Sequence, residues 1–260
     1  MRVTVLMEDA AARPGLTAEH GLSLYVEARG RRILFDAGQT EAFADNAAAL
    51  GVDLGQVDLA ILSHGHYDHA GGLQRFLREN DHAPVYVHRD AFEPHWHGTE
   101  KDIGVDPALE NSARVVKVSG QVDLGCGMTL TDCNRLPMAW PPSFGGLHVK
   151  RNGQLLADDF RHEQYLLIRE EERLIALSGC SHKGAMNILE WLAPDVLIGG
   201  FHFVKLDPSG DELAAAAREL ARRSCLCYTG HCTGDAQFAV LKASLGDRLQ
   251  ALHGGMVFEI

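Results

Sequence analysis

The sequence has little of what marks membrane, fibrous or disordered proteins. No run approaches the ~20 consecutive apolar residues of a membrane helix. Charged residues make up 23% of the chain and hydrophobic residues 46%, which excludes a disordered, collagen-like or coiled-coil chain. Basic residues are outnumbered, because 24 Lys and Arg stand against 35 Asp and Glu, for a net charge of −11. Such a charge repels nucleic acid and anionic membranes, so we expect neither as a partner.

We expect no secretory signal peptide at the start of this sequence. Residues Met1–Asp9 turn acidic too soon for a signal peptide. Six cysteines without such a leader fit reduced thiols, so we expect a cytoplasmic protein. The length of 260 residues is typical of a single α/β domain with a large buried core. The sequence leaves the oligomeric state open, and a homo-oligomer is compatible with it.

Short apolar segments alternate with helical stretches in two rounds. The first round predicts strands near 22–26, 33–35, 57–62 and 85–87, with helices near 41–50 and 71–79. The second predicts strands near 166–169, 174–177, 195–198, 225–228 and 256–260, with helices near 184–192, 209–223 and 236–245. Ser209 and Glu212 have the spacing of a capping box that opens the 209–223 helix. Two such rounds predict two sheets packed face to face with helices outside.

Two segments, 89–115 and 131–163, interrupt this alternation. They are polar, rich in Pro, Gly and His, and look irregular. Because long irregular stretches in a compact domain usually have a functional role, we predict that they form an insertion or lid over a site. Trp96, Trp140 and Phe144 lie in them, where aromatic rings stack on a flat ligand or simply pack within the lid.

The fourteen histidines are the unusual feature of the composition, and four ligand-type residues gather in one short motif. His64, His66, Asp68 and His69 directly follow a predicted buried strand and precede Gly71-Gly72. Alternate residues of an extended segment point the same way, which pairs His64 with His66. Imidazole and carboxylate groups suit zinc, iron or manganese. Four such ligands in one turn predict a site for one or two divalent transition-metal ions, and we expect zinc.

This motif, His-x-His-x-Asp-His after a buried strand, resembles the signature of the metallo-β-lactamase-fold superfamily. The Phe35-Asp-Ala-Gly38 turn and the later ligand-like segments follow in the expected order, so the resemblance covers nearly the whole chain. It implies an α/β fold (α+β in some schemes), a four-layer αββα sandwich. It also implies a site for one or two metal ions at one edge of the sheets.

Further ligand candidates follow from the same resemblance. In the superfamily an Asp that bridges two metals commonly stands where Cys180 stands here, and His182 lies two residues on, so either residue is a candidate ligand. We favour His182. His231 resembles the last histidine of the superfamily. His202 also follows a predicted strand, where functional residues of layered folds gather, and is a candidate ligand, proton donor or substrate contact.

The remaining histidines carry weaker predictions. His162 lies where some members of the superfamily place a ligand, but we leave it out of the predicted set. The others lack a place at a strand end, and we expect most of them on the surface, with His95 and His97 as candidates to line the lid. This last set contains His82, His88, His95, His97, His148 and His253.

Six separated motifs resemble a narrower group, the dihydropterin ribofuranosylaminobenzene phosphate synthase-like subfamily. They are Glu19-His-Gly-Leu-Ser23, Asn46 with Leu50-Gly51, Ser63-His-Gly-His66, Gly179-Cys-Ser-His182 with Asn187, Gly199-Gly-Phe-His202 and His231-Cys-Thr-Gly234. The resemblance implies a pterin-pathway synthase, although the chain has no P-loop for phosphate.

Our leading hypothesis is a metal-dependent hydrolase for a small, anionic substrate, because bound dications make a positive pocket in an acidic protein. Asp68 holds the second ion or steers the water, and His202 protonates the leaving group. The alternatives are a pterin-pathway transferase or synthase, a di-iron oxidoreductase, and a metal-binding sensor without catalysis.

Overall fold

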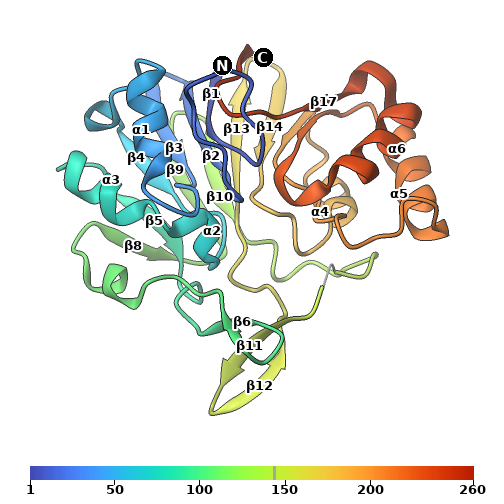
Figure 1. Cartoon of the computed structure of the whole chain (residues 1–260), viewed down its shortest axis with the longest axis horizontal. Helices are drawn as coiled ribbons and strands as arrows, with labels where there is room; N and C mark the ends of the chain where they lie inside the picture. Colours follow the sequence, from blue (N-terminus) through green and yellow to red (C-terminus); the bar gives the residue numbers. More distant parts are fainter. Residues whose placement is uncertain (143–144) are drawn as a thin grey trace.

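The computed structural model describes residues 1–142 and 145–260. Figure 1 shows strands and helices of the N-terminal half on one side and the C-terminal helices on the other. The first sheet has seven strands in the order β18-β1-β2-β3-β4-β5-β8. Its strands are β1 (Arg2–Met7), β2 (Ser23–Ala28), β3 (Arg31–Phe35), β4 (Leu59–Ile61), β5 (Val85–His88), β8 (Val115–Val118) and β18 (Val257–Glu259).

The second sheet also has seven strands, in the order β17-β16-β15-β14-β13-β10-β9. They are β9 (Gln121–Gly125), β10 (Met128–Thr131), β13 (Tyr165–Glu170), β14 (Arg173–Leu177), β15 (Val196–Ile198), β16 (Leu226–Thr229) and β17 (Leu249–Ala251). β14, β15, β16 and β17 run parallel, so their carboxyl ends meet at one edge. That edge is where side chains from distant parts of the chain can gather.

Six α-helices of the described residues accompany the sheets. They are α1 (Ala42–Ala49), α2 (Tyr67–Ala70), α3 (Leu73–Glu79), α4 (Ala185–Leu192), α5 (Asp211–Ala221) and α6 (Asp235–Leu245). In Figure 1, α1 and α3 cover the outer side of the first sheet, and α4, α5 and α6 lie beyond the second. The result is the predicted αββα sandwich.

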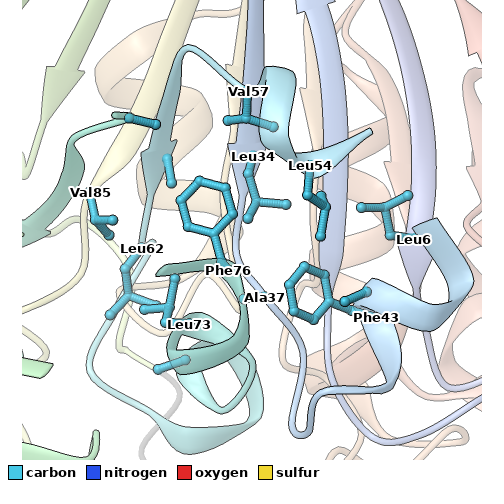
Figure 2. Close-up of a cluster of buried hydrophobic side chains, with 14 of the residues drawn as sticks. Leu6, Leu34, Ala37, Phe43, Leu54, Val57, Leu62, Leu73, Phe76 and Val85 are labelled. Atoms are coloured by element: carbon cyan, nitrogen blue, oxygen red, sulfur yellow. The ribbon is translucent and has the colours of Figure 1, made fainter. Parts of the chain in front are cut away.

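The order of layers follows from the alternation of side chains along each strand. In β3, Ile33 and Phe35 face the core between the two sheets, whereas Leu34 faces α1 and α3. Figure 2 shows the helix side of this arrangement, where Leu34 packs with Phe43 and Phe76. Burial on both faces explains why these strands read as continuous apolar runs in the sequence.

The two segments expected to be irregular contain a third, four-stranded sheet. It has the order β12-β11-β6-β7 and is formed by β6 (His95–His97), β7 (Lys101–Asp102), β11 (Leu147–Arg151) and β12 (Gln154–Ala157). The sequence does not indicate these strands, because each is short and two of them pair across about fifty residues. Figure 1 shows this sheet projecting from one end of the sandwich. Its role as a lid stays a prediction.

The predicted capping box at Ser209 is wrong. Gly210 is the N-cap of α5, and no side-chain cap bond is made there. Ser209 instead donates from its backbone N–H and its hydroxyl to Asp207 Oδ1, at 2.9 and 2.8 Å, because Asp207 forms a local turn that competes with capping. No helix in the described part of the chain is long and apolar enough to cross a membrane.

Candidate metal centre

The loop after β4 presents the His-x-His-x-Asp-His motif at the edge of the sheets. Asp36, which follows β3, fixes the start of this loop, since its carboxylate accepts the Ser63 N–H and the Ser63 hydroxyl at 2.7 Å each. His66 has extended backbone, and α2 begins at the next residue. Because the chain passes from strand to helix within this loop, the ligand-type side chains leave it in different directions.

Three histidines form one cluster, the histidine group, which consists of His64, His66 and His182. Their rings are close, with centroid distances of 4.6 Å between His64 and His66, 4.9 Å between His64 and His182, and 4.8 Å between His66 and His182. His182 comes from the loop after β14 and stacks on Phe160. The structure therefore brings together two predicted ligands from one loop and a third from more than a hundred residues away.

The buried nitrogens of the histidine group have free hydrogen-bonding capacity. Nε2 of His64, Nε2 of His66 and both ring nitrogens of His182 have no hydrogen-bond partner within residues 1–142 and 145–260. The Ser63 hydroxyl donates to Asp36, so at 2.8 Å it accepts from Nδ1 of His64 and leaves the Nε2 lone pair free. Unpaired buried polar atoms are costly. A metal ion held by these nitrogens would remove that cost.

The protonation state of the histidine group suits metal binding. Burial, and then the neighbouring histidines, lower the pKa of His64 well below 6.5. Burial also lowers the pKa of His66 and of His182 well below that value. Neutral imidazoles have a lone pair to give to a metal, whereas imidazolium rings have none.

A second cluster, the mixed group, consists of Asp68, His69, Cys180 and His231. Nε2 of His69 lies 3.2 Å from the Cys180 sulfur, and Nε2 of His231 lies 3.4 Å from Asp68 Oδ2. His69 donates from Nδ1 to Asp36 at 2.7 Å, and His231 pairs through Nδ1 with Asp9 at 2.8 Å. Both rings therefore turn Nε2 toward the other members of the group. The two groups adjoin, since the His64 and His69 rings are 4.2 Å apart.

The ionisation of the mixed group differs from that of the histidine group. Burial by itself would raise the pKa of Asp68, but His69 and His231 lower it below its ordinary value. Burial would lower the pKa of His231, but the neighbouring carboxylates of Asp68 and Asp9 raise it well above 6.5. Burial and the neighbouring Cys232 raise the pKa of Cys180. Without metal, the mixed group therefore holds protons that an ion would have to displace.

His202 lies beside the histidine group rather than within it. Its backbone has a positive φ of 53°, and its ring centroid is 4.4 Å from that of His182. Burial and then His231 lower the pKa of His202 to about 4, so the ring is neutral near pH 7. It lines two cavities at once.

The first cavity lies over both groups and has a volume of about 340 Å³. His66, Asp68, Cys180, His182 and His231 reach it from the donor groups. Lys101, Lys205, His20 and His97 also line it. A second cavity of about 500 Å³ adjoins at His202 and is largely apolar, with Trp140, Met186 and Phe203 in its wall.

Some histidines lie elsewhere than the sequence predicts. His88 and His95 were expected on the surface or in the lid, but their side chains are buried and pair with Asp132 and Asp158. His162 is likewise buried, between Gly65 and Asp158. These placements differ from expectation because the buried carboxylates that satisfy the rings lie dozens of residues away for His88 and His95.

Sequence reasoning missed the partners that hold the ligands. Asp36 supports His69 and, through Ser63, His64, whereas Asp9 supports His231. His20 also lines the cavity, with Nε2 3.5 Å from Asp68. In the sequence, the only signal for His20 is its place in a motif that resembles the subfamily. Of the three lid aromatics, Trp140 lines the apolar cavity, Trp96 does not, and Phe144 lies outside the described residues.

The chain is similar to a curated protein and to a solved structure over its whole length. It is 27% identical over 288 residues to 7,8-dihydropterin-6-methyl-4-(beta-D-ribofuranosyl)-aminobenzene-5'-phosphate synthase of Methanocaldococcus jannaschii, covering 100% of this chain and 96% of that protein. A solved structure described as a metal-dependent hydrolase of the β-lactamase superfamily, Tm1679, matches with a TM-score of 0.85 and 29% identity, covering 100% of this chain and 99% of that one.

A more distant structure shares the fold alone. Zn²⁺-bound PqqB of Methylobacterium extorquens matches with a TM-score of 0.56 and 12% identity, covering 100% of both chains. The family model described as the metallo-beta-lactamase superfamily matches residues 16–175, which is more than half of the chain. With the sandwich fold and the donor groups at its edge, this match shows that the chain belongs to the metallo-β-lactamase superfamily.

Proposed function

We propose that the protein is a metal-dependent hydrolase that acts on a small, anionic substrate. The observation that carries this proposal is the pair of adjoining donor groups under one cavity, whose lining includes His66, His182 and His231 with unpartnered buried nitrogens. The similarity to a structure described as a metal-dependent hydrolase supports the same class of reaction.

We further propose that the two groups hold one ion each and that zinc is the preferred metal. Three imidazoles in the histidine group are a common zinc ligand set, and a thiol with imidazole and carboxylate suits zinc in the mixed group. Iron or manganese are alternatives for the same ligands. Bound divalent ions supply Lewis acidity toward a substrate oxygen and lower the pKa of water toward about 7.

The chain's own residues orient and bind around that chemistry. Asp68 reaches the cavity from the mixed group and can accept a hydrogen bond from the attacking water. His202, neutral near pH 7, is placed to hydrogen-bond the leaving group. The sequence predicts that His202 is a proton donor, which requires a protonated ring before the reaction. Because the pKa of His202 is lowered, the neutral ring is favoured, and with it a role as a hydrogen-bonding contact.

The size and charge of the cavity support the substrate class. About 340 Å³ suits a small molecule and excludes a polymer in the cavity itself. Lys101 and Lys205 add positive charge at its wall, and Lys101 is oriented by a 2.9 Å hydrogen bond to the Tyr67 hydroxyl. An anionic group on the substrate would meet these ammonium groups on entry.

The test is hydrolysis by zinc-loaded protein of a panel of small phosphodiesters, carboxylic esters, thioesters and lactones. We expect turnover of at least one anionic member that disappears in His64→Ala and persists in His82→Ala, a matched change at an exposed histidine. Full zinc occupancy without turnover of any panel member would count against a hydrolase with this substrate range.

A pterin-pathway transferase or synthase is the second candidate. The apolar cavity with Trp140 in its wall favours it, since this cavity adjoins the metal-facing one and suits a flat ring. The similarity to the M. jannaschii synthase supports the same candidate. Quenching of pterin fluorescence on addition of the protein, lost in Trp140→Ala, is the expected sign. Unquenched fluorescence at saturating protein would favour the hydrolase.

A further inference from the structure

Three consecutive residues after β12, namely His162, Glu163 and Gln164, connect the two loops that carry the histidine group. One loop contains His64 and His66, and the other contains His182. All three connecting side chains are buried. The site predicted from the sequence does not include them, and their role follows from their contacts.

His162 holds the main chain between two of the ligands. The backbone N–H of Gly65 donates to Nδ1 of His162 at 2.8 Å, which makes Nδ1 an acceptor. The proton of the neutral ring is therefore on Nε2, from which it donates to Asp158 Oδ2 at 3.2 Å. Both ring nitrogens are used, and the lone pair that a metal would need is committed to Gly65.

Gly65 itself sits where a side chain could not. A Cβ at this position would lie 2.4 Å from the carbonyl oxygen of Ala91, so the backbone is packed against its surroundings. The N–H bond to His162 therefore fixes a segment that has no room to shift. Because Gly65 stands between His64 and His66, this fixes the points from which both ligands leave the chain.

Glu163 holds the other loop. Its carboxylate accepts the backbone N–H of His182 on Oε1 at 2.6 Å and that of Lys183 on Oε2 at 3.0 Å. The Tyr165 hydroxyl donates to Oε2 as well, at 2.7 Å. Lys183 returns a bond from Nζ to the carbonyl oxygen of Glu163 at 3.0 Å. Charge-assisted bonds to a fully buried carboxylate are among the stronger ones in proteins.

Gln164 completes the connection to the first loop. Its backbone N–H donates to the carbonyl oxygen of Ser63 at 2.8 Å, and its side-chain amide donates to that of Leu62 at 2.8 Å. Residues 162–164 thus bond to the residues that precede and separate the first two ligands, and to the backbone of the third.

We propose that residues 162–164 are a brace that positions the histidine group for its metal, and that His162 is a positioning residue instead of a ligand. The inference rests on the metal binding of the proposed function but not on any reaction. It assigns the third nitrogen ligand to His182, whose two ring nitrogens are unpartnered in the described chain. Partners that orient metal ligands commonly change metal affinity by about 10–100-fold.

The test compares metal binding in His162→Ala, His162→Asn and Glu163→Gln, with His82→Asn and Glu172→Gln as controls at exposed positions. Asn places an amide oxygen near the position of Nδ1 and can accept the Gly65 N–H, whereas Ala cannot. Affinity is measured by competition with a chromophoric chelator. Cobalt(II) absorption reports the ligand set, and the melting temperature of metal-free protein reports folding.

We expect His162→Ala and Glu163→Gln to weaken cobalt binding by about 10–100-fold while the number of ions at saturation and the cobalt spectrum stay those of the wild type. His162→Asn should bind close to wild type. Loss of one ion with a changed spectrum in both His162 variants would make His162 a ligand and overturn the proposal. Unchanged affinity in His162→Ala and Glu163→Gln would overturn it too.

Two further outcomes remain informative. If His162→Ala does not fold, the cobalt affinities of His162→Asn and Glu163→Gln are compared instead. The proposal requires Glu163→Gln to bind cobalt more weakly than the wild type and His162→Asn to bind it about as well. Wild-type protein that binds no cobalt would contradict the proposed function itself. If the wild type binds cobalt and the variants bind it equally well, only the proposed role of residues 162–164 would be contradicted.

Discussion

The two donor groups of the centre are supported in different ways. The histidine group is held from behind by buried residues, and the side chains of His162 and Glu163 have no exposed surface. The mixed group is held on one side by the buried Asp36, which bonds His69, and on the other by the N-terminal loop, where the side chains of Asp9 and His20 are 39% and 53% exposed. One sandwich edge therefore carries a rigidly supported cluster beside a cluster with solvent-facing partners.

The two groups also differ in the protonation of their side chains. Burial keeps the rings of the histidine group neutral, so their lone pairs are ready for an ion. In the mixed group, the pKa of His231 and that of Cys180 are both raised, so protons must leave before an ion binds. We expect the histidine group to bind the tighter ion and the mixed group the more exchangeable one.

The largest expected effect comes from His64→Ala, because His64 belongs to the histidine group and touches His69 of the mixed group. We expect affinity to fall by more than about 100-fold, since even outer partners of a metal site cost about 10–100-fold. Elemental analysis after growth in metal-supplemented medium measures the loss. Metal content equal to that of His82→Ala would contradict the assignment.

Stepwise removal of metal by a chelator should distinguish the two groups by the order in which they lose their ions. A mild chelator should remove the mixed-group ion first and thereby expose Cys180 to thiol reagents, since a thiolate at a metal is shielded. Mass spectrometry of labelled Cys180 against the number of bound ions reads this order. Equally fast labelling of Cys180 in loaded and stripped protein would contradict an ion at the mixed group.

A third effect is in the pH dependence of binding. Because the pKa of His231 is raised, the metal-free ring is charged at neutral pH, and an ion at the mixed group must displace a proton. Affinity there should fall by at least about tenfold per pH unit on acidification, one displaced proton giving that slope. The neutral histidine group should show little change between about pH 8 and about pH 6.5. If metal titrations gave the same dependence of affinity on pH for both groups, the predicted difference in their protonation would be contradicted.

The smallest expected effect concerns Glu8, which supports His231 from a buried position and accepts its backbone N–H. Burial raises the pKa of Glu8 to about 7, against 4.5 ordinarily. Between these values the folded protein binds the extra proton, so its free energy of unfolding falls as pH rises.

Glu8→Gln removes this titration. In metal-free protein, the decrease in the free energy of unfolding with rising pH should therefore be smaller by about 1–3 kcal/mol in this variant than in the wild type. Melting temperatures at about pH 5 and about pH 7 test it, with Glu172→Gln as the exposed control. A variant with the same pH dependence as the wild type would show that Glu8 titrates normally.

Much of this centre could be predicted from the sequence because its ligands obey local rules. His64, His66, Asp68 and His69 stand in one short motif after a buried strand, and the structure brings them together as expected. His182 and His231 follow the ends of β14 and β16, which both pair in parallel with β15, so those ends lie at the same edge of the sheet.

The supports could not be predicted, since they depend on contacts far apart in the chain. Asp9 meets His231 across 222 residues, and His162 meets Gly65 across 97. The strands of the third sheet pair His95 with Val149, which no local pattern announces. Ser209 shows the opposite failure, because its local signal was present but Asp207 competed for the same donors.

We propose above all that the two adjoining groups each hold one ion. Anomalous diffraction at the zinc edge from crystals of zinc-loaded protein tests it most directly. We predict two peaks, one bound by His64, His66 and His182 and the other by the mixed group, with His162 bonded to Gly65. A zinc-loaded protein in which one of the two groups lacks a peak would contradict it, and so would an ion held by His95, Asp158 and His162.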